Sequence, residues 1–222
     1  HLITFAPASV QEACDLIQLA FDLSDQYRCP AMLIGDGMIG QMMEPVELKA
    51  PKKRELPPKT WATTGWDDKT RERAVVNSIY IEFEAIEELN RRLQARYAEI
   101  EKNETLWEEY NLDGAEVVVY AYGIVARIVK SAIGLCAKAG VKVGLVRPIT
   151  LWPFPKAAVR KAAEMDSVKG LLTVEMSAGQ MVEDVRLAVN GIKDVELIGK
   201  LGSTIPTAEE IAEKIMKMTG RE

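Results

Sequence analysis

The stretch EVVVYAYG, residues 116–123, is an apolar run that ends at a glycine. Three similar runs follow at regular intervals: VKVGLVRP (141–148), GLLTVEM (170–176) and VELIG (195–199). Helical patterns separate and follow them, at about residues 124–139, 155–166, 179–190 and 207–218. Strands that are apolar on both faces are typical of a parallel sheet buried beneath helices. With right-handed crossovers, the alternation predicts an α/β fold with a doubly wound parallel sheet over residues 115–222.

Residues 1–48 have the pattern of one strand–helix–strand unit. LITF (2–5) and AMLIG (31–35) are short apolar strands, and Ser9 and Glu12 are spaced as a helix capping box. The apolar positions predicted to share one helix face are Val10, Ala13, Cys14, Ile17, Ala20, Phe21 and Leu23. Because one such unit cannot form a domain, we expect it to end a larger domain that continues upstream of His1. His1 itself, the only histidine, is interpreted as a frayed terminus or a cloning remnant.

Residues 49–114 are predicted to form a linker and a long helix. The part 49–67 contains three prolines and five basic side chains, which is typical of a surface linker, although contact with an acidic ferredoxin or a CoA phosphate is an alternative. Residues 68–110 carry a seven-residue apolar repeat, with a helical break expected near Asn103. This helix could pack against the rest of its own protein or pair with a second copy in a coiled-coil homodimer. The repeat consists of Val76, Phe83, Asn90 and Tyr97, interleaved with Ile79, Ile86, Leu93 and Ile100.

Composition excludes several classes of function. The net charge of −5 argues against nucleic acid as a partner, and no apolar run is long enough to span a membrane. Cys14, Cys29 and Cys136 form no C-x-x-C pair, which argues against an iron–sulfur cluster or a structural zinc and favours a reducing, cytoplasmic compartment. Without an internal histidine, a Ser-His or Cys-His catalytic pair is excluded.

The segment LIGDGMIGQMMEPVEL, residues 33–48, contains both G-x-G-x-x-G and G-D-G. A dinucleotide site would need a helix and a second strand after Gly40, but Pro45 and the proline-containing linker follow instead. A thiamine diphosphate site would need an asparagine to complete the Mg²⁺ ligands, and the next one is Asn77. We therefore predict that the segment binds neither, that its glycines serve a sharp turn through positive φ and close backbone approach, and that its methionines pack against another surface.

Four motifs together resemble a known family. They are APASVQEACDLIQLAFDLSDQYRCPAMLIGDGMIGQMMEPVEL (6–48), Tyr122-Gly123 with Arg127, RPITLWPFP (147–155) and VEMSAGQMVEDVR (174–186). The chain resembles the alpha subunit of 2-oxoacid:ferredoxin oxidoreductases, above all the 2-ketoisovalerate (branched-chain) type, with the end of the pyrimidine-binding domain at 1–48. Residues 115–222 are similar to the transketolase C-terminal domain, except that Ser177 stands where an asparagine is expected.

The resemblance implies that the complete enzyme oxidatively decarboxylates a 2-oxoacid to its acyl-CoA with thiamine diphosphate, Mg²⁺ and iron–sulfur clusters, and reduces ferredoxin. It assigns the coenzyme anchor to a beta subunit and the clusters to a ferredoxin-like subunit or domain. We therefore predict no catalytic residue, cofactor or metal in this chain, and an isolated chain that is inactive. The residues predicted to serve family motifs or interfaces are Asp36, Gly37, Met38, Gly40, Glu44, Gly123, Arg127, Arg147, Pro148, Glu175 and Gln180.

Local chemistry suggests roles for some of these residues. Gly123 is expected to make a tight strand-to-helix turn, or else to begin a helix whose amides meet an anion. Arg147, at the carboxyl end of a strand, is expected to pair with Glu175, or else to bind a ligand. Gln180 and Met181 open a helix and could face a neighbouring subunit. Two alternatives for the function remain at this point: a module that binds CoA or a nucleotide phosphate, and a subunit of the 2-oxoglutarate type.

Overall fold

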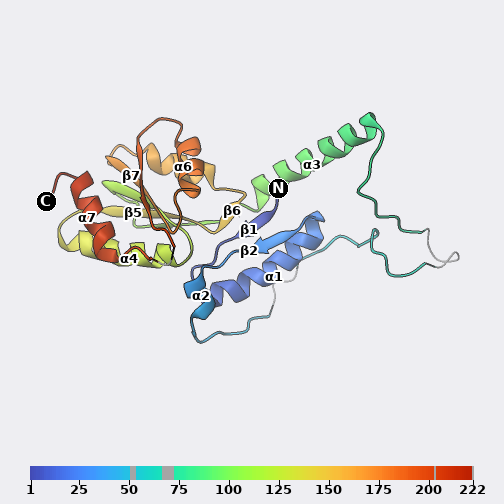
Figure 1. Ribbon diagram of the computed structural model, residues 1–222, viewed down its shortest axis with the longest axis horizontal. Helices are drawn as coiled ribbons and strands as arrows, with labels where there is room; N and C mark the ends of the chain where they lie inside the picture. The colour runs from blue at the N-terminus through green and yellow to red at the C-terminus, as the bar shows by residue number, and fades with distance from the viewer. Residues whose placement is uncertain (51–53, 67–72, 203, 222) are drawn as a thin grey trace.

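The computed structural model describes residues 1–50, 54–66, 73–202 and 204–221 (Figure 1). Two sheets form its framework: a small sheet with the strand order β2-β1-β6 and a large sheet with the order β3-β5-β4-β7-β8. The strands are β1 (Ile3–Phe5), β2 (Ala31–Leu33), β3 (Trp107–Tyr110), β4 (Val117–Tyr120), β5 (Val143–Pro148), β6 (Thr150–Trp152), β7 (Gly170–Glu175) and β8 (Val195–Gly199). The helices are α1 (Val10–Tyr27), α2 (Gly37–Gln41), α3 (Phe83–Asn103), α4 (Gly123–Lys138), α5 (Lys156–Ala163), α6 (Met181–Val189) and α7 (Ala208–Met218).

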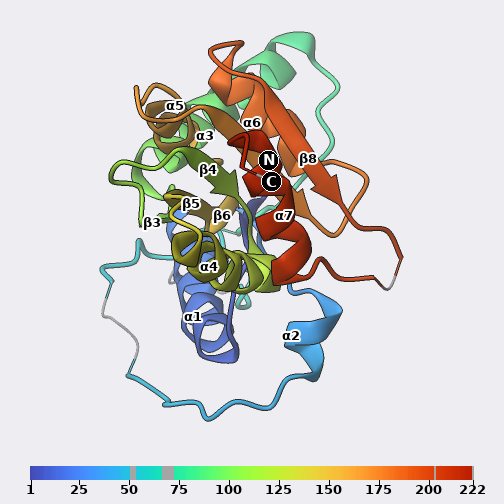
Figure 2. The same cartoon turned by 90° about the vertical axis from the view of Figure 1, so that its left-hand side faces the viewer.

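The large sheet confirms the predicted parallel strands and adds a strand that was not predicted. β5, β4, β7 and β8 are parallel, while β3 runs antiparallel to β5 at the edge. Val117 and Val119 face a core formed with α4 and α7, and Val118 and Tyr120 face a second core formed with α5 and α6. Figure 2 shows the two helix pairs on opposite sides of the sheet. The sheet is therefore buried on both faces, as its continuous apolar strands require.

The small sheet joins the N-terminal segment to the segment that follows β5. β1 and β2 are parallel and flank α1, which confirms the predicted strand–helix–strand unit. β6 then pairs antiparallel with β1, although it belongs to the segment directly after β5. The chain thus passes from the large sheet to the small one between Pro148 and Thr150. The N–H of Ala6 donates to the carbonyl of Ile149 at 2.8 Å beside this crossing.

The predicted apolar face of α1 is right only in part. Ala20 and Leu23 are buried in the core of the small sheet, together with Leu16, which the pattern did not single out. Ile17 and Phe21 are exposed, Phe21 by 71%. No helix in the described ranges is long and apolar enough to cross a membrane.

The connecting region differs from the prediction of one long helix. The described part of the linker, residues 54–66, contains no helix or strand, and its basic side chains pair with the body: Lys59 with Asp25 at 2.7 Å and Arg54 with Glu104 at 3.4 Å. The helix predicted over 68–110 is wrong at both ends, because α3 covers only Phe83–Asn103 and β3 follows it; residues 68–72 lie outside the described part. The predicted break near Asn103 is confirmed.

A local reason explains the late start of α3. Residues 75–81 contain several β-branched side chains, which lose rotamer freedom in a helix, and no side chain caps the helix at Glu82. The last turns of α3 pack against the small sheet through buried Ile100 and half-buried Tyr97. Its first half projects from the body (Figure 1).

Candidate functional site

The carboxyl ends of β4, β5 and β7 form the edge at which parallel α/β sheets usually bind ligands. In this protein the first 48 residues lie against that edge, with α2 beside the beginning of α4 (Figure 1). Three acidic side chains of the N-terminal segment, Glu12, Asp36 and Glu44, bind groups of the large-sheet part there. We call these three contacts the carboxylate bridges.

The first bridge is made by the aspartate of G-D-G. One oxygen of Asp36, Oδ1, accepts the N–H groups of Met38 and Ile39 at 3.0 and 2.9 Å and so caps α2. The other, Oδ2, accepts the N–H of Ile124 at 3.1 Å, at the beginning of α4. Gly123 has φ +59°, and a Cβ there would lie 3.1 Å from the same oxygen. Gly123 therefore makes the expected turn from strand to helix. The amide that follows it meets a carboxylate of this chain, Asp36, so the alternative of a bound anion stays a prediction that nothing here tests.

The three glycines of the segment 33–48 do not have the role that was predicted for them. Gly35, Gly37 and Gly40 have no left-handed backbone angle, and a Cβ added to any of them would meet no atom within 4 Å. The prediction of positive φ and close internal approach is wrong, because a short helix rather than a strained turn follows Asp36. Ile39 is buried against the α4 core, while Met43 is 97% exposed. One side of α2 packs inward, and open space lies beside each glycine.

The second bridge is an arginine with two carboxylate partners. Arg147 is only 5% exposed; its Nη1 and Nη2 donate to the two oxygens of Glu12, each at 2.8 Å, and its Nε donates to Glu108 at 2.8 Å. Burial alone would lower the pKa of Arg147, but the hydrogen bonds and charges of these two carboxylates raise it above its ordinary value. Burial opposes ionisation of Glu108 as well, yet Lys130 and Arg147 hold its pKa below its ordinary value.

The predicted pairing of Arg147 with Glu175 is wrong. β4 lies between β5 and β7 in the sheet, so the ends of the two strands are about 10 Å apart. Neither Glu12 nor Glu108 was predicted as a partner. Glu12 was recognised only through its capping spacing, and Glu108 was assigned to the end of the long helix.

The capping box predicted at the beginning of α1 is present in one of its two hydrogen bonds. The N–H of Glu12 donates to Ser9 Oγ at 3.1 Å, as predicted. The Glu12 carboxylate accepts the N–H of Ala8 at 2.7 Å, not that of Ser9.

The third bridge connects α1, the end of the N-terminal segment and α4. Glu44 accepts the N–H of Val10 at 3.0 Å and the Nη1 of Arg127 at 2.8 Å. The hydrogen bond from Val10, followed by that from Arg127, holds the pKa of Glu44 below its ordinary value. Two predicted family-motif residues, Glu44 and Arg127, are thus in direct contact.

Glu175 has a separate task within the large-sheet part. It is 1% exposed and accepts the N–H groups of Gln180, Met181 and Val182 at 3.0–3.1 Å, so it is the anion at the beginning of α6. Ser177 Oγ donates to the same carboxylate at 2.9 Å. The serine therefore keeps a side-chain hydrogen bond at the position where the family pattern has asparagine.

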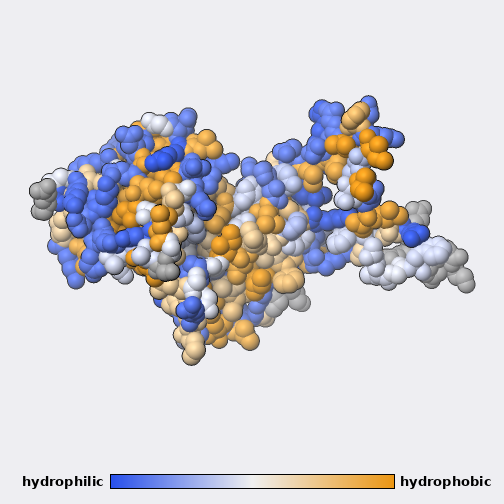
Figure 3. All heavy atoms as spheres, in the orientation of Figure 1, coloured by the Kyte–Doolittle hydropathy of each residue, from blue (hydrophilic) through white to orange (hydrophobic). Residues whose placement is uncertain are grey.

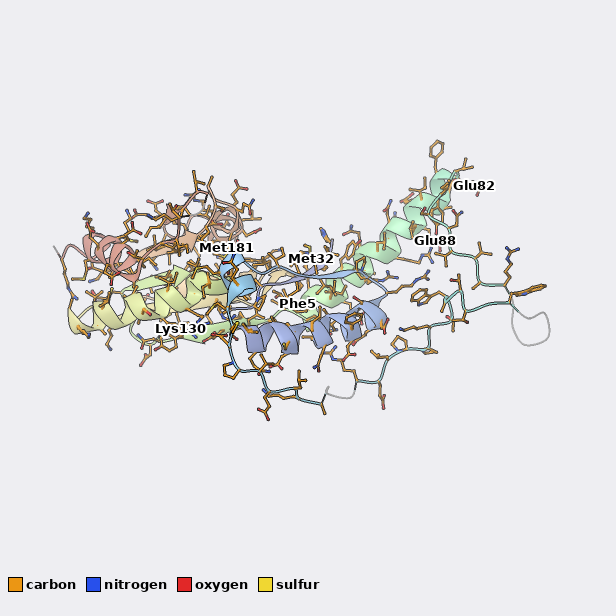
Figure 4. The ribbon with its side chains drawn as sticks, turned by 60° about the horizontal axis from the view of Figure 1, so that its bottom comes forward. Phe5, Met32, Glu82, Glu88, Lys130 and Met181 are labelled. Carbon is orange, nitrogen blue, oxygen red and sulfur yellow. The ribbon has the colours of Figure 1, made fainter. Side chains whose placement is uncertain are left out.

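The remaining predicted residues lie apart from the bridges. Met38 is exposed on α2, and Pro148 ends β5 opposite Trp107 of β3. Gln180 precedes α6 and is exposed. Met181, which was expected to face a neighbouring subunit with Gln180, is instead buried in the core beside α5 and α6; Figure 4 labels it.

The residues at this edge do not fit a diphosphate held through Mg²⁺. Both oxygens of Asp36 are engaged by backbone amides, and the beginnings of α4 and α6 already hold the carboxylates of Asp36 and Glu175. Among the described residues, no group of three or more His, Cys, Asp and Glu side chains is arranged to bind a metal ion. Cys29 and Cys136 are buried, and burial raises the pKa of each thiol.

Comparison with known proteins identifies the family. Residues 1–108 match the family model described as "Pyruvate flavodoxin/ferredoxin oxidoreductase, thiamine diP-bdg". Residues 115–211 match "Pyruvate:ferredoxin oxidoreductase core domain II". The chain belongs to the 2-oxoacid:ferredoxin oxidoreductase family. This membership confirms the resemblance found in the sequence at the level of the family.

Two curated oxidoreductase relatives cover almost all of the chain. It is 42% identical to ketoisovalerate oxidoreductase subunit VorB of Methanothermobacter thermautotrophicus over 98% of its length, and spans 60% of that protein. It is 30% identical to 2-oxoglutarate synthase subunit KorA of Methanothermobacter marburgensis, again over 98% of its length and over 64% of that protein. The chain thus spans a little under two thirds of each relative.

Two solved structures share the fold. The 2-oxoglutarate:ferredoxin oxidoreductase from Magnetococcus marinus, solved with 2-oxoglutarate, coenzyme A and succinyl-CoA bound, aligns with a TM-score of 0.72 at 15% identity. That alignment covers 98% of this chain and 42% of the solved one. A split-gene transketolase aligns with a TM-score of 0.52 at 12% identity, over 99% of this chain and 57% of the other. These likenesses support a transketolase-like α/β fold.

Proposed function

We propose that this chain is part of the alpha subunit of a thiamine-diphosphate-dependent ferredoxin oxidoreductase that acts on 2-ketoisovalerate. The assembled enzyme would decarboxylate the 2-oxoacid oxidatively, transfer the acyl group to CoA and pass the electrons through iron–sulfur clusters to ferredoxin. Family membership supports the reaction type, and identities of 42% to VorB against 30% to KorA favour a branched-chain substrate over 2-oxoglutarate.

Within that enzyme, the chain acts as a scaffold. We assign residues 1–48 to the end of a pyrimidine-binding domain, 49–114 to a linker and helix, and 115–222 to a transketolase C-terminal-like domain. The carboxylate bridges carry this proposal, because Glu12, Asp36 and Glu44 connect the first part to the third at Arg147, Ile124 and Arg127. The third part thereby fixes the position of the G-D-G segment.

The coenzyme anchor is assigned to another part of the enzyme. One matching family is described as binding thiamine diphosphate, yet the carboxylate of G-D-G in this chain is occupied by three backbone amides. The beginnings of α4 and α6, where a CoA phosphate would bind most readily, hold carboxylates too. The same observation argues against the alternative of a CoA- or nucleotide-binding module.

The glycines of α2 indicate that the exposed side of this helix contacts a partner subunit. Gly37 and Gly40 have no internal steric reason to be glycine, and the exposed Met38 and Met43 stand beside them. A flat backbone surface with flexible apolar side chains suits close contact with another chain. We assign this surface to the beta subunit of the complex.

A glycine-to-alanine pair tests the assignment in the complete enzyme. Gly40→Ala should leave the chain folded, or stabilise it by about 0.5–1 kcal/mol, because alanine is the better helix former and meets no neighbouring atom. Gly134→Ala in α4 is the matched control, since a Cβ there also meets nothing. Ferredoxin reduction dependent on 2-ketoisovalerate and CoA should fall about tenfold or more in the Gly40→Ala enzyme only. Equal activity of the two variants would contradict the assignment of this surface to the beta subunit. A kcat/KM of the wild-type enzyme that is higher for 2-oxoglutarate than for 2-ketoisovalerate would contradict the proposed substrate.

A further inference from the structure

The end of α1, residues 25–28, is held by contacts from two distant parts of the chain. Each of its four residues has a side-chain partner outside α1. The pairs are Asp25 with Lys59 at 2.7 Å, Gln26 with Arg54 at 2.9 Å, Tyr27 with Glu104 at 2.8 Å, and Arg28 with Trp61, whose ring centre lies 4.7 Å from the guanidinium. Three of these partners belong to residues 54–61 of the linker, which we call the clasp, and the fourth lies at the end of α3.

Glu104 is a buried carboxylate in an unfavourable place. It is 7% exposed and lies at the C-terminal end of α3, where the partial negative charge of the helix opposes an anion. The hydroxyl of Tyr27 donates to one of its oxygens, and Nη2 of Arg54 lies 3.4 Å from the other. Within the described ranges, Arg54 is its one ion-pair partner. Because a buried carboxylate that loses its cation is strongly destabilised, Arg54 contributes more than an exposed linker arginine would.

Arg54 contacts the ends of two helices at once. Its Nη1 donates to Gln26 near the end of α1, and its Nη2 donates to Glu104 at the end of α3. The first half of α3 stands away from the body in Figure 3, and Figure 4 labels Glu82 at its far end. Trp61 and Glu104, which precede and follow this projecting region in the chain, both contact the same turn of α1. The position of the projecting helix therefore depends on the linker.

We propose that the clasp is a conformational lock for the projecting helix. While Arg54 is bound, the end of α3 is held against the end of α1. When the linker leaves, Glu104 loses its cation and the end of α3 is released. The lock responds to salt because its cations are partly open to water, with 48% of the Lys59 side chain and 33% of the Arg54 side chain exposed. High ionic strength is therefore the condition that opens it.

Hydrogen exchange of the 222-residue chain, followed by mass spectrometry, tests the lock. In Arg54→Met, exchange should be about tenfold faster or more both in the clasp and in the last turn of α3, residues 100–104, because a buried carboxylate has lost its cation. In Lys59→Met it should be faster in the clasp alone, since Lys59 pairs with α1 and Arg54 still binds Glu104. Arg91→Met is the matched control, because Arg91 forms an exposed pair within the first half of α3, and it should change neither segment.

Glu104→Gln separates the effect of charge from that of packing. Glutamine keeps an oxygen that accepts from Tyr27 but needs no cation, so adding Arg54→Met in that background should not speed exchange at residues 100–104 any further. In the wild type, about 1 M NaCl should speed exchange in both segments, because the screening length falls to about 3 Å. Circular dichroism confirms that each variant is folded. Faster exchange of the clasp alone in Arg54→Met, an equal effect of Arg54→Met in both backgrounds, or no response to salt would overturn the proposal.

Discussion

Replacing Arg147 by alanine removes the most buried of the carboxylate bridges. Three hydrogen bonds of 2.8 Å to ionised partners are lost, and the two carboxylates are left without their shared cation. Each such bond contributes about 1.5–3 kcal/mol when buried, but Glu12 and Glu108 keep 23% and 31% of their side-chain surface in water. We therefore expect a loss of about 3 kcal/mol in the free energy of unfolding. Arg147→Lys should lose about half as much, because the ammonium cannot reproduce the planar fork.

Urea unfolding followed by circular dichroism measures this change. Arg160→Ala is the matched control, since Arg160 pairs with Glu164 in an exposed contact along one helix and should contribute less than about 0.5 kcal/mol. A double-mutant cycle between Arg147→Ala and Glu12→Ala should give a coupling energy of about 1.5 kcal/mol or more. The corresponding cycle with Glu175→Gln should give a coupling near zero. A loss below about 1 kcal/mol for Arg147→Ala, or strong coupling to Glu175, would refute the geometry of the bridge.

Three further changes test other parts of the site. Asp36→Ala should destabilise the chain by about 1–2 kcal/mol and speed amide exchange at Ile39 and Ile124 together, because one carboxylate holds both; faster exchange at Ile39 alone would contradict the bridge. Glu175→Ala should lower stability by about 3 kcal/mol in urea unfolding, since it strips three buried amides of their acceptor, and a loss no larger than that of an exposed glutamate would contradict this role. Burial and a neighbouring carboxylate raise the pKa of Tyr27 to about 12, so its contribution to stability should be complete below pH 10 and lost as the pH rises toward 12. Tyr27→Phe should flatten that alkaline loss, and an unchanged profile would contradict the shift.

Much of the fold could be predicted because its signals are local. The four parallel strands and their helices each carry an apolar run or a helical period, and the strand–helix–strand unit at residues 1–48 does too. β3 was missed because its sequence, WEEY, has two adjacent acidic residues between two aromatic ones and so shows neither an apolar run nor a strict alternation. It forms a strand because it pairs with β5. β6 was missed because it is three residues long and depends on β1, which lies about 145 residues earlier in the chain.

The site was less predictable because its contacts join distant residues. Asp36, Glu44, Gly123, Arg127 and Arg147 were singled out by their motifs, and the structure brings all of them to one edge of the large sheet. Their pairing could not be inferred from one sequence, because strand order decides which strand ends are neighbours. That order places β4 between Arg147 and the glutamate first expected to bind it.

The central claim is that this chain supplies the scaffold while the coenzyme is anchored elsewhere in the enzyme. Isothermal titration calorimetry of thiamine diphosphate with Mg²⁺ into the purified 222-residue chain tests it most directly. We expect no binding tighter than about 1 mM, because the carboxylate of G-D-G and both nearby helix beginnings are already occupied. A dissociation constant in the micromolar range, lost in Asp36→Ala, would contradict the claim.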